Sequence, residues 1–122
     1  MIKTKLKPVL PSLREKKRYL AFEVISKEKI DNPRVVSDAI LNCSLEFIGK
    51  LGAAKAGIMF LSNKWNAGSQ RGIIKVGHKH VDQIKAALAL ATKIDDKQVI
   101  IRSLGVSGVL NKVERNFLNL AG

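Results

Sequence analysis

The 122-residue sequence has very few of the residues that build disulfides and metal sites. It contains one cysteine, Cys43, and two histidines, His78 and His80. A single cysteine excludes an internal disulfide, and its apolar neighbours on an expected helix indicate a core residue. Structural zinc prefers four Cys or His ligands. The sequence therefore predicts no metal site.

Long apolar runs are also absent. None approaches the roughly 20 residues that a membrane-spanning helix needs. The N-terminus lacks the apolar stretch and small-residue cleavage site of a signal peptide, and no basic amphipathic helix or lipidation signal is evident. With 46% apolar residues the chain can still fill the core of one domain. We therefore expect a single-domain, cytoplasmic protein without a membrane partner.

Acidic residues are scarce. The chain carries 10 acidic and 22 basic residues, a formal net charge of +12. Such an excess favours a polyanionic partner, with nucleic acid as the first candidate.

The basic residues are concentrated near the N-terminus, where residues 1–18 hold seven of them and one acid, Glu15. Pro8 and Pro11 predict an extended arm over residues 1–13, followed by one domain over residues 14–122. A basic arm that leads into a strand is typical of phosphate binding, although such runs are often only solvated. The candidate RNA-binding residues are Lys5, Lys7, Arg14, Lys16, Lys17, Arg18 and Lys79.

Hydrophobic periodicity predicts the order βαββαβ with an added C-terminal helix. We expect strands over residues 18–27, 54–62, 71–77 and 98–104. Helices are expected from Asn32-Pro33 to Gly49 or Gly52, over 79–93 and over 109–120. This order predicts an α/β (α+β) ferredoxin-like fold, with four antiparallel strands and two helices on one face, similar to RNA-recognition modules.

The expected third strand tests whether the sheet reads bases. RNA-recognition modules open this strand with Arg/Lys-Gly and follow it with stacking aromatics. Here Arg71-Gly72 precedes Ile73 and Ile74, and Tyr19 is the only aromatic expected on the open face. The fold is thus expected to resemble these modules while base stacking is not.

The open sheet face has the composition of a protein interface, with apolar residues and charged edges. The candidate interface residues are Ile25, Ile73, Ile100 and Leu104. The alternative is that the C-terminal helix folds over this face and completes the core. Both can hold on different parts of the sheet.

No catalytic constellation is visible. The sequence has no nucleophile elbow and no histidine linked to a carboxylate by a motif. The residues His78-Lys79-His80 are expected to cap the second helix, with Lys79 near a phosphate, or to form a solvated loop. A small phosphatase-like enzyme is disfavoured because the loop at residues 26–33 has no glycine.

Four segments together resemble the archaeal ribonuclease P protein component 2 family, and the resemblance spans about residues 8–120. The first is the run LREKKRYLAFEV at residues 13–24. The others are Arg71-Gly72-Ile73-Ile74-Lys75-Val76, the segment from His78 to Asp82 with Ala86-Ala87-Leu88, and Leu104-Gly105-Val106-Ser107-Gly108 leading to Glu114-Arg115-Asn116-Phe117-Leu118.

The resemblance implies a subunit of the ribonucleoprotein that removes the 5′ leader of precursor transfer RNA. Its implied partners are ribonuclease P RNA and ribonuclease P protein component 3, and self-association stays open. The magnesium-assisted chemistry would belong to the RNA, so the protein would need no cofactor and no active site. A ribosomal or ribosome-assembly protein is the alternative, since it would share the size, charge and fold.

Overall fold

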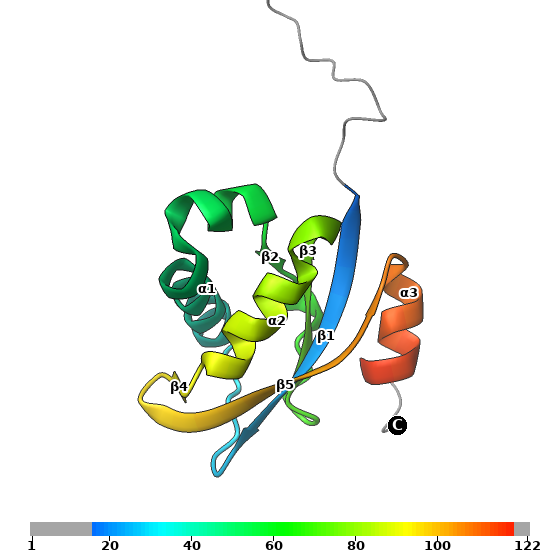
Figure 1. Ribbon diagram of the computed structural model, residues 1–122. Helices are drawn as coiled ribbons and strands as arrows, with labels where there is room; N and C mark the ends of the chain where they lie inside the picture. Colours follow the sequence, from blue (N-terminus) through cyan, green and yellow to red (C-terminus); the bar gives the residue numbers. More distant parts are fainter. Residues whose placement is uncertain (1–15, 119–122) are drawn as a thin grey trace, which may run out of the picture.

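The computed structural model describes residues 16–118 as an α+β domain (Figure 1). Five antiparallel strands form one curled sheet in the order β2-β3-β1-β5-β4. The elements are β1 (Lys17–Ser26), α1 (Pro33–Ala56), β2 (Met59–Phe60), β3 (Arg71–Gly77), α2 (Val81–Leu90), β4 (Lys93–Ile94), β5 (Lys97–Ser107) and α3 (Leu110–Val113). No helix in the described part of the chain is both long and apolar enough to cross a bilayer.

The first strand, β1, lies at the centre of the sheet. It pairs with β3 and β5, so that Tyr19 lies opposite Lys75 on one side and Ser107 on the other. The strand predicted over residues 18–27 is confirmed, and its side chains alternate, since Leu20 and Phe22 are fully buried beneath α1 and α2 while Ala21 lies on the other face. β1 therefore connects both halves of the sheet to one core.

The long helix α1 begins as predicted. The Asn32 side chain accepts a hydrogen bond from the Arg34 N–H at 2.9 Å, and Pro33 is the first helical residue. The predicted end at Gly49 or Gly52 is wrong. Gly49 (φ 77°) interrupts the helix, which then resumes and ends at Gly57 in the left-handed conformation. The helix therefore takes up chain that was expected to be strand.

This longer helix changes the element that follows it. The strand expected over residues 54–62 shrinks to the two residues of β2. Phe47, an apolar residue of α1, is 45% exposed. The core beneath α1 and α2 is instead completed by buried residues of both helices and the sheet, among them Val36, Ile40, Ile74, Val76, Ile84, Leu88 and Ile101.

A short hairpin adds a fifth strand to the four that were expected. Asp95 and Asp96 both have positive φ, 50° and 65°, which is the geometry of a tight turn between twisted strands. The helix α2 ends at Leu90, earlier than expected, and this leaves Lys93 and Ile94 to pair with the start of β5.

The C-terminal helix covers half of the opposite sheet face. α3 is followed by a π turn at Glu114–Leu118. Val113 and Leu118 pack against Ala21 and Ile73, with the Phe117 ring and Leu104 beside them. The alternative that the C-terminal helix folds over the face is confirmed on this part of the sheet, and the interface role predicted for Ile73 and Leu104 does not fit here. Ile73 is fully buried and Leu104 is half-buried, because α3 completes a second core.

Candidate nucleic-acid interface

Basic side chains gather where β1 begins. The Lys16 carbonyl accepts a hydrogen bond from the His78 N–H at 2.8 Å, and the His78 Nδ1 atom lies 3.2 Å from the same oxygen. Lys17 is paired with Gly77, the last residue of β3. The start of β1 and the segment that enters α2 are therefore held side by side.

Lys17 extends toward the C-terminal end of α1. A Cβ atom built on Gly57, the C-cap residue of that helix, would lie 2.7 Å from the Lys17 Nζ atom. A cation is favoured at a helix C-terminus because the last carbonyl groups carry partial negative charge. This position gives Lys17 a structural role alongside any role in binding.

Arg18 extends toward the turn between β5 and α3. Its Nη1 atom donates to the Lys17 carbonyl at 3.2 Å and would lie 3.3 Å from a Cβ atom on Gly108. Arg18 as a whole residue is half-buried, and the bond to Lys17 with the position beside Gly108 partly fixes its guanidinium before any ligand binds. A planar donor group held in this way suits phosphate recognition.

Lys79 lies in a 3₁₀ turn, His78–His80, that leads into α2. Its side chain is exposed. His80 is the N-cap residue of α2, as one of the two alternatives predicted, but its side chain makes no cap bond, and its Nδ1 atom lies 3.0 Å from Gln83 Oε1. Lys79 nonetheless lies close to Lys16 along the backbone, since His78 bonds to Lys16.

Four of the seven predicted RNA-binding residues therefore lie at one end of the sheet. These are Lys16, Lys17, Arg18 and Lys79, which come from two segments about 60 residues apart in the sequence. The other three, Lys5, Lys7 and Arg14, lie outside the described residues. We name the assembled cluster of Lys16, Lys17, Arg18, His78 and Lys79 the basic end.

Charged side chains from three strands form an ion cluster on the sheet face, at the border of the part that α3 leaves uncovered. The Glu23 carboxylate on β1 meets Arg102 of β5 at 2.7 Å and Arg71 of β3 at 3.4 Å. Arg71 also donates to the Phe117 carbonyl at 2.9 Å. This cluster anchors the π turn after α3 and marks the border of the surface that α3 covers.

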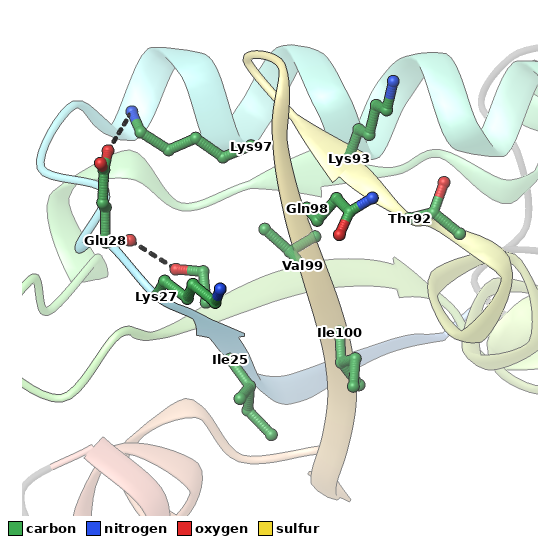
Figure 2. Close-up of a pocket in the computed structure, with 10 residues that line it drawn as sticks. Ile25, Lys27, Glu28, Thr92, Lys93, Lys97, Gln98, Val99 and Ile100 are labelled. Atoms are coloured by element: carbon green, nitrogen blue, oxygen red, sulfur yellow. Dashed lines mark hydrogen bonds and ion pairs between the residues drawn. The ribbon is translucent and has the colours of Figure 1, made fainter.

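Beyond this border two of the predicted interface residues remain exposed. Ile25 and Ile100 are directly paired across β1 and β5 and are 46% and 63% exposed. They border a groove of about 870 Å³ (Figure 2). Their role in binding a protein stays a prediction.

The described residues offer no metal-binding cluster of three or more His, Cys, Asp or Glu side chains. Burial, and then the nearby Glu46 carboxylate, raises the pKa of the Cys43 thiol. The Cys43 Sγ atom donates to the Ala87 carbonyl at 2.7 Å and so links α1 to α2. A thiol in this environment is a structural group rather than a nucleophile.

Sequence reasoning missed two contributors to the basic end. Gly57 and Gly108 leave room for Lys17 and Arg18, and no local signal connects either glycine to these side chains. Gln70 was also missed. It is buried with positive φ, and its side chain bonds to the Ile30 N–H at 2.9 Å and to the Ile30 carbonyl at 3.0 Å.

A family model for the Rpp14/Pop5 family matches residues 18–118. The chain belongs to the Rpp14/Pop5 family. The match begins at Arg18 in the basic end and runs through β5 to the end of the π turn, so it includes nearly every described element.

Curated relatives match over almost their whole lengths. "Ribonuclease P protein component 2" of Thermococcus kodakarensis is 38% identical over 117 residues, or 96% of this chain and 95% of that protein. The protein of the same name from Pyrococcus abyssi is 39% identical, over 97% and 98% of the two chains. That of Methanosarcina mazei is 36% identical, over 96% and 97%.

A solved structure shares the fold. A chain in a cryo-EM structure of yeast ribonuclease MRP has a TM-score of 0.60 to this protein at 14% identity, and the match covers 88% of this chain and 89% of that one. At this identity the likeness concerns the fold alone.

Proposed function

We propose that this protein is a protein subunit of ribonuclease P, which removes the 5′ leader of precursor transfer RNA. The observation that carries the proposal is the similarity to several proteins named ribonuclease P protein component 2 along nearly the whole of both chains. The basic end supports it, because exposed cations at one end of a small domain suit a phosphate backbone.

The basic end would hold the RNA without reading its sequence. Lysine and arginine contacts to phosphates release counterions, reduce repulsion between neighbouring phosphates and stabilise a compact RNA. The sheet supplies no row of stacking aromatics, because Tyr19 lies against the second core. The hydrolysis itself, with its magnesium ions, is assigned to the RNA, and the protein acts as a scaffold.

The strand order supports a ferredoxin-like arrangement in which β1 and β3 are central and the two-residue β4 is an addition. In this proposal α3 occupies part of the face that RNA-recognition modules use for bases. Ribonuclease P protein component 3 is the proposed protein partner. Self-association of the chain is a separate prediction, which the same purified protein can be used to test.

Purification of the tagged full-length chain from its own cells tests this function. We expect one abundant RNA, much smaller than ribosomal RNA, to co-purify, and the fraction to cleave precursor transfer RNA at its 5′ end when magnesium is present. Mass spectrometry of the same fraction should identify component 3. Co-purification of ribosomal RNA and ribosomal proteins would instead indicate the ribosomal alternative.

The highly purified protein alone serves as the control. We expect it to cleave nothing, because residues 16–118 show no constellation of nucleophile, base and metal ligands. Site-specific 5′ cleavage that survives nuclease treatment of the preparation would place chemistry in the protein and contradict the scaffold role.

A further inference from the structure

The outer edge of β5 has no partner strand along most of its length. The inner edge pairs with β1 from Val99 to Ser107. On the outer edge, β4 pairs only with Lys97 and Gln98, and no other strand in residues 16–118 reaches that edge (Figure 1). An unpaired strand edge is a template for the addition of another strand.

The hydrogen-bond pattern shows which backbone groups face outward. The Val99 N–H donates to the Thr92 carbonyl at 2.9 Å, on the side away from β1. The Val24 N–H donates to the Gln70 carbonyl at 2.8 Å, on the β3 side, so it does not bond to its partner Ile101. The backbone groups of every second residue in a strand point to the same side. Ile101 is two residues after Val99, so its N–H and C=O groups also point outward, away from β1.

The groove in Figure 2 spans β5, from the end of β1 on its inner side to Thr92 and Lys93 on its outer side. Ile100 supplies exposed apolar surface next to the outer edge that can pack against the side chains of an added strand, and Ile25, its partner on β1, extends this apolar surface away from the edge. The charged residues that line the groove are one acid and three lysines: Glu28, Lys27, Lys93 and Lys97. The Glu28 carboxylate is 4.0 Å from the Lys97 ammonium, which leaves an excess of positive charge.

These features select one kind of occupant. A second copy of this chain would bring its own Lys93 and Lys97 to the same edge, and like charges repel. An RNA strand would satisfy the lysines but has no regular N–H and C=O groups to continue the sheet. An extended peptide with alternating apolar and acidic residues matches the backbone edge, the isoleucines and the lysines together.

We propose that the outer edge of β5 is a docking site for an extended, acidic segment of a partner protein, which adds to the sheet as a further strand. Main-chain hydrogen bonds to Ile101 would supply affinity, and Ile25 and Ile100 with the lysines would supply selectivity. The proposal does not depend on the RNA, so it can fail while the ribonuclease P function holds, and the reverse.

Nuclear magnetic resonance on the full-length protein, without RNA, tests the site. The probe is a capped peptide of alternating valine and glutamate. We expect the Ile101 amide proton to exchange readily in the free protein and to become protected when the peptide is added. A peptide of the same sequence in which every backbone nitrogen is methylated has no N–H donor on either edge, so it cannot pair as a strand and should not bind.

Matched variants locate the contact. Ile100→Asp should weaken peptide binding about tenfold, since it places a carboxylate beside the acidic strand. Leu51→Asp, at a 70% exposed position on α1, should leave binding unchanged. The proposal is overturned if the N-methylated peptide binds equally, if Ile101 stays unprotected at saturation, or if an oligouridine protects Ile101 while the peptide does not.

Discussion

At the scale of single residues, Gly105 shows how closely the C-terminal segment fits the sheet. A Cβ atom on Gly105 would lie 2.2 Å from the Phe117 ring. Neither the ring nor the strand can move without loosening the second core. The glycine is therefore required by the close approach of the Phe117 ring to β5.

Gly105→Ala should destabilise the protein by about 1–3 kcal/mol, because overpacking forces the Phe117 ring out of its site. Urea denaturation of purified protein measures the change. Gly108→Ala is the matched control, since its Cβ atom would meet only the flexible end of Arg18 at 3.3 Å. Equal stability for the two variants would show that Phe117 does not pack on β5.

The Cys43 thiol gives a pH-dependent test of the contact between α1 and α2. Its pKa is raised by burial and by Glu46, so the folded state holds the proton more tightly than the unfolded state does. The stabilisation is complete below the unfolded pKa and is lost as pH rises through the folded pKa. The folded protein should therefore lose stability at alkaline pH.

Iodoacetamide alkylation followed by mass spectrometry tests the same thiol. At pH 8 the native protein should react more slowly than the urea-unfolded protein, and the difference should shrink as pH rises. Faster reaction of the native chain would contradict the raised pKa.

At the scale of elements, α3 divides the sheet face into a covered and an uncovered part. Ile73 and Ile100 both lie on this face in apolar strands, yet α3 buries the first completely and leaves the second 63% exposed. The Glu23 cluster with Arg71 and Arg102 marks the boundary. The same substitution on the two sides should therefore have very different effects.

Ile73→Asp should destabilise the fold by at least about 3 kcal/mol, because it removes a packed side chain and buries a carboxylate. Ile100→Asp should cost no more than about 1 kcal/mol at its exposed strand position. Thermal and urea denaturation of both variants provide the measurement. Similar losses in both would mean that α3 does not distinguish the two sites.

The elements also show what a sequence can and cannot reveal. The alternation in β1, the Asn32-Pro33 helix start and the bounds of β3 are local signals, and the structure confirms them. The resumption of α1 beyond Gly49, the two-residue β4 and the cover by α3 depend on contacts between distant segments. The basic end was predicted in composition, but its link to His78 follows only from the pairing of β1 with β3.

At the scale of the whole molecule, two groups of three cations lie at opposite ends of β1. Lys16, Lys17 and Arg18 begin the strand, while Lys27, Lys93 and Lys97 lie near its end. Removing either group changes the net charge by the same amount. A comparison of the two triple variants therefore separates the effect of net charge on RNA binding from the effect of where the charges lie.

Replacing Lys16, Lys17 and Arg18 with Ala should weaken RNA binding on unrelated RNAs alike. The slope of log K against log salt should flatten by roughly two to three units, since each phosphate contact contributes about 0.7 to 0.9. Fluorescence titrations between low and moderate salt measure it. Loss of the Lys17 contact to α1 could lower stability, so folding is checked by circular dichroism.

The triple variant at Lys27, Lys93 and Lys97 is the control with the same change in net charge. It should keep most of the slope. If both triple variants lose the same amount, binding follows net charge alone and the basic end is not a site. If neither changes, the contacts must lie elsewhere, with Lys112 and Arg115 as the next candidates.

The central position of β1 has a consequence for how the chain folds as it is synthesised. Among the described elements β1 is made first, but its neighbour β3 follows only after α1, and its other neighbour β5 follows only after α2. Such non-local pairing raises contact order and slows folding. Until β5 leaves the ribosome, β1 keeps one edge unpaired, and this nascent state is the one most exposed to wrong pairing and aggregation.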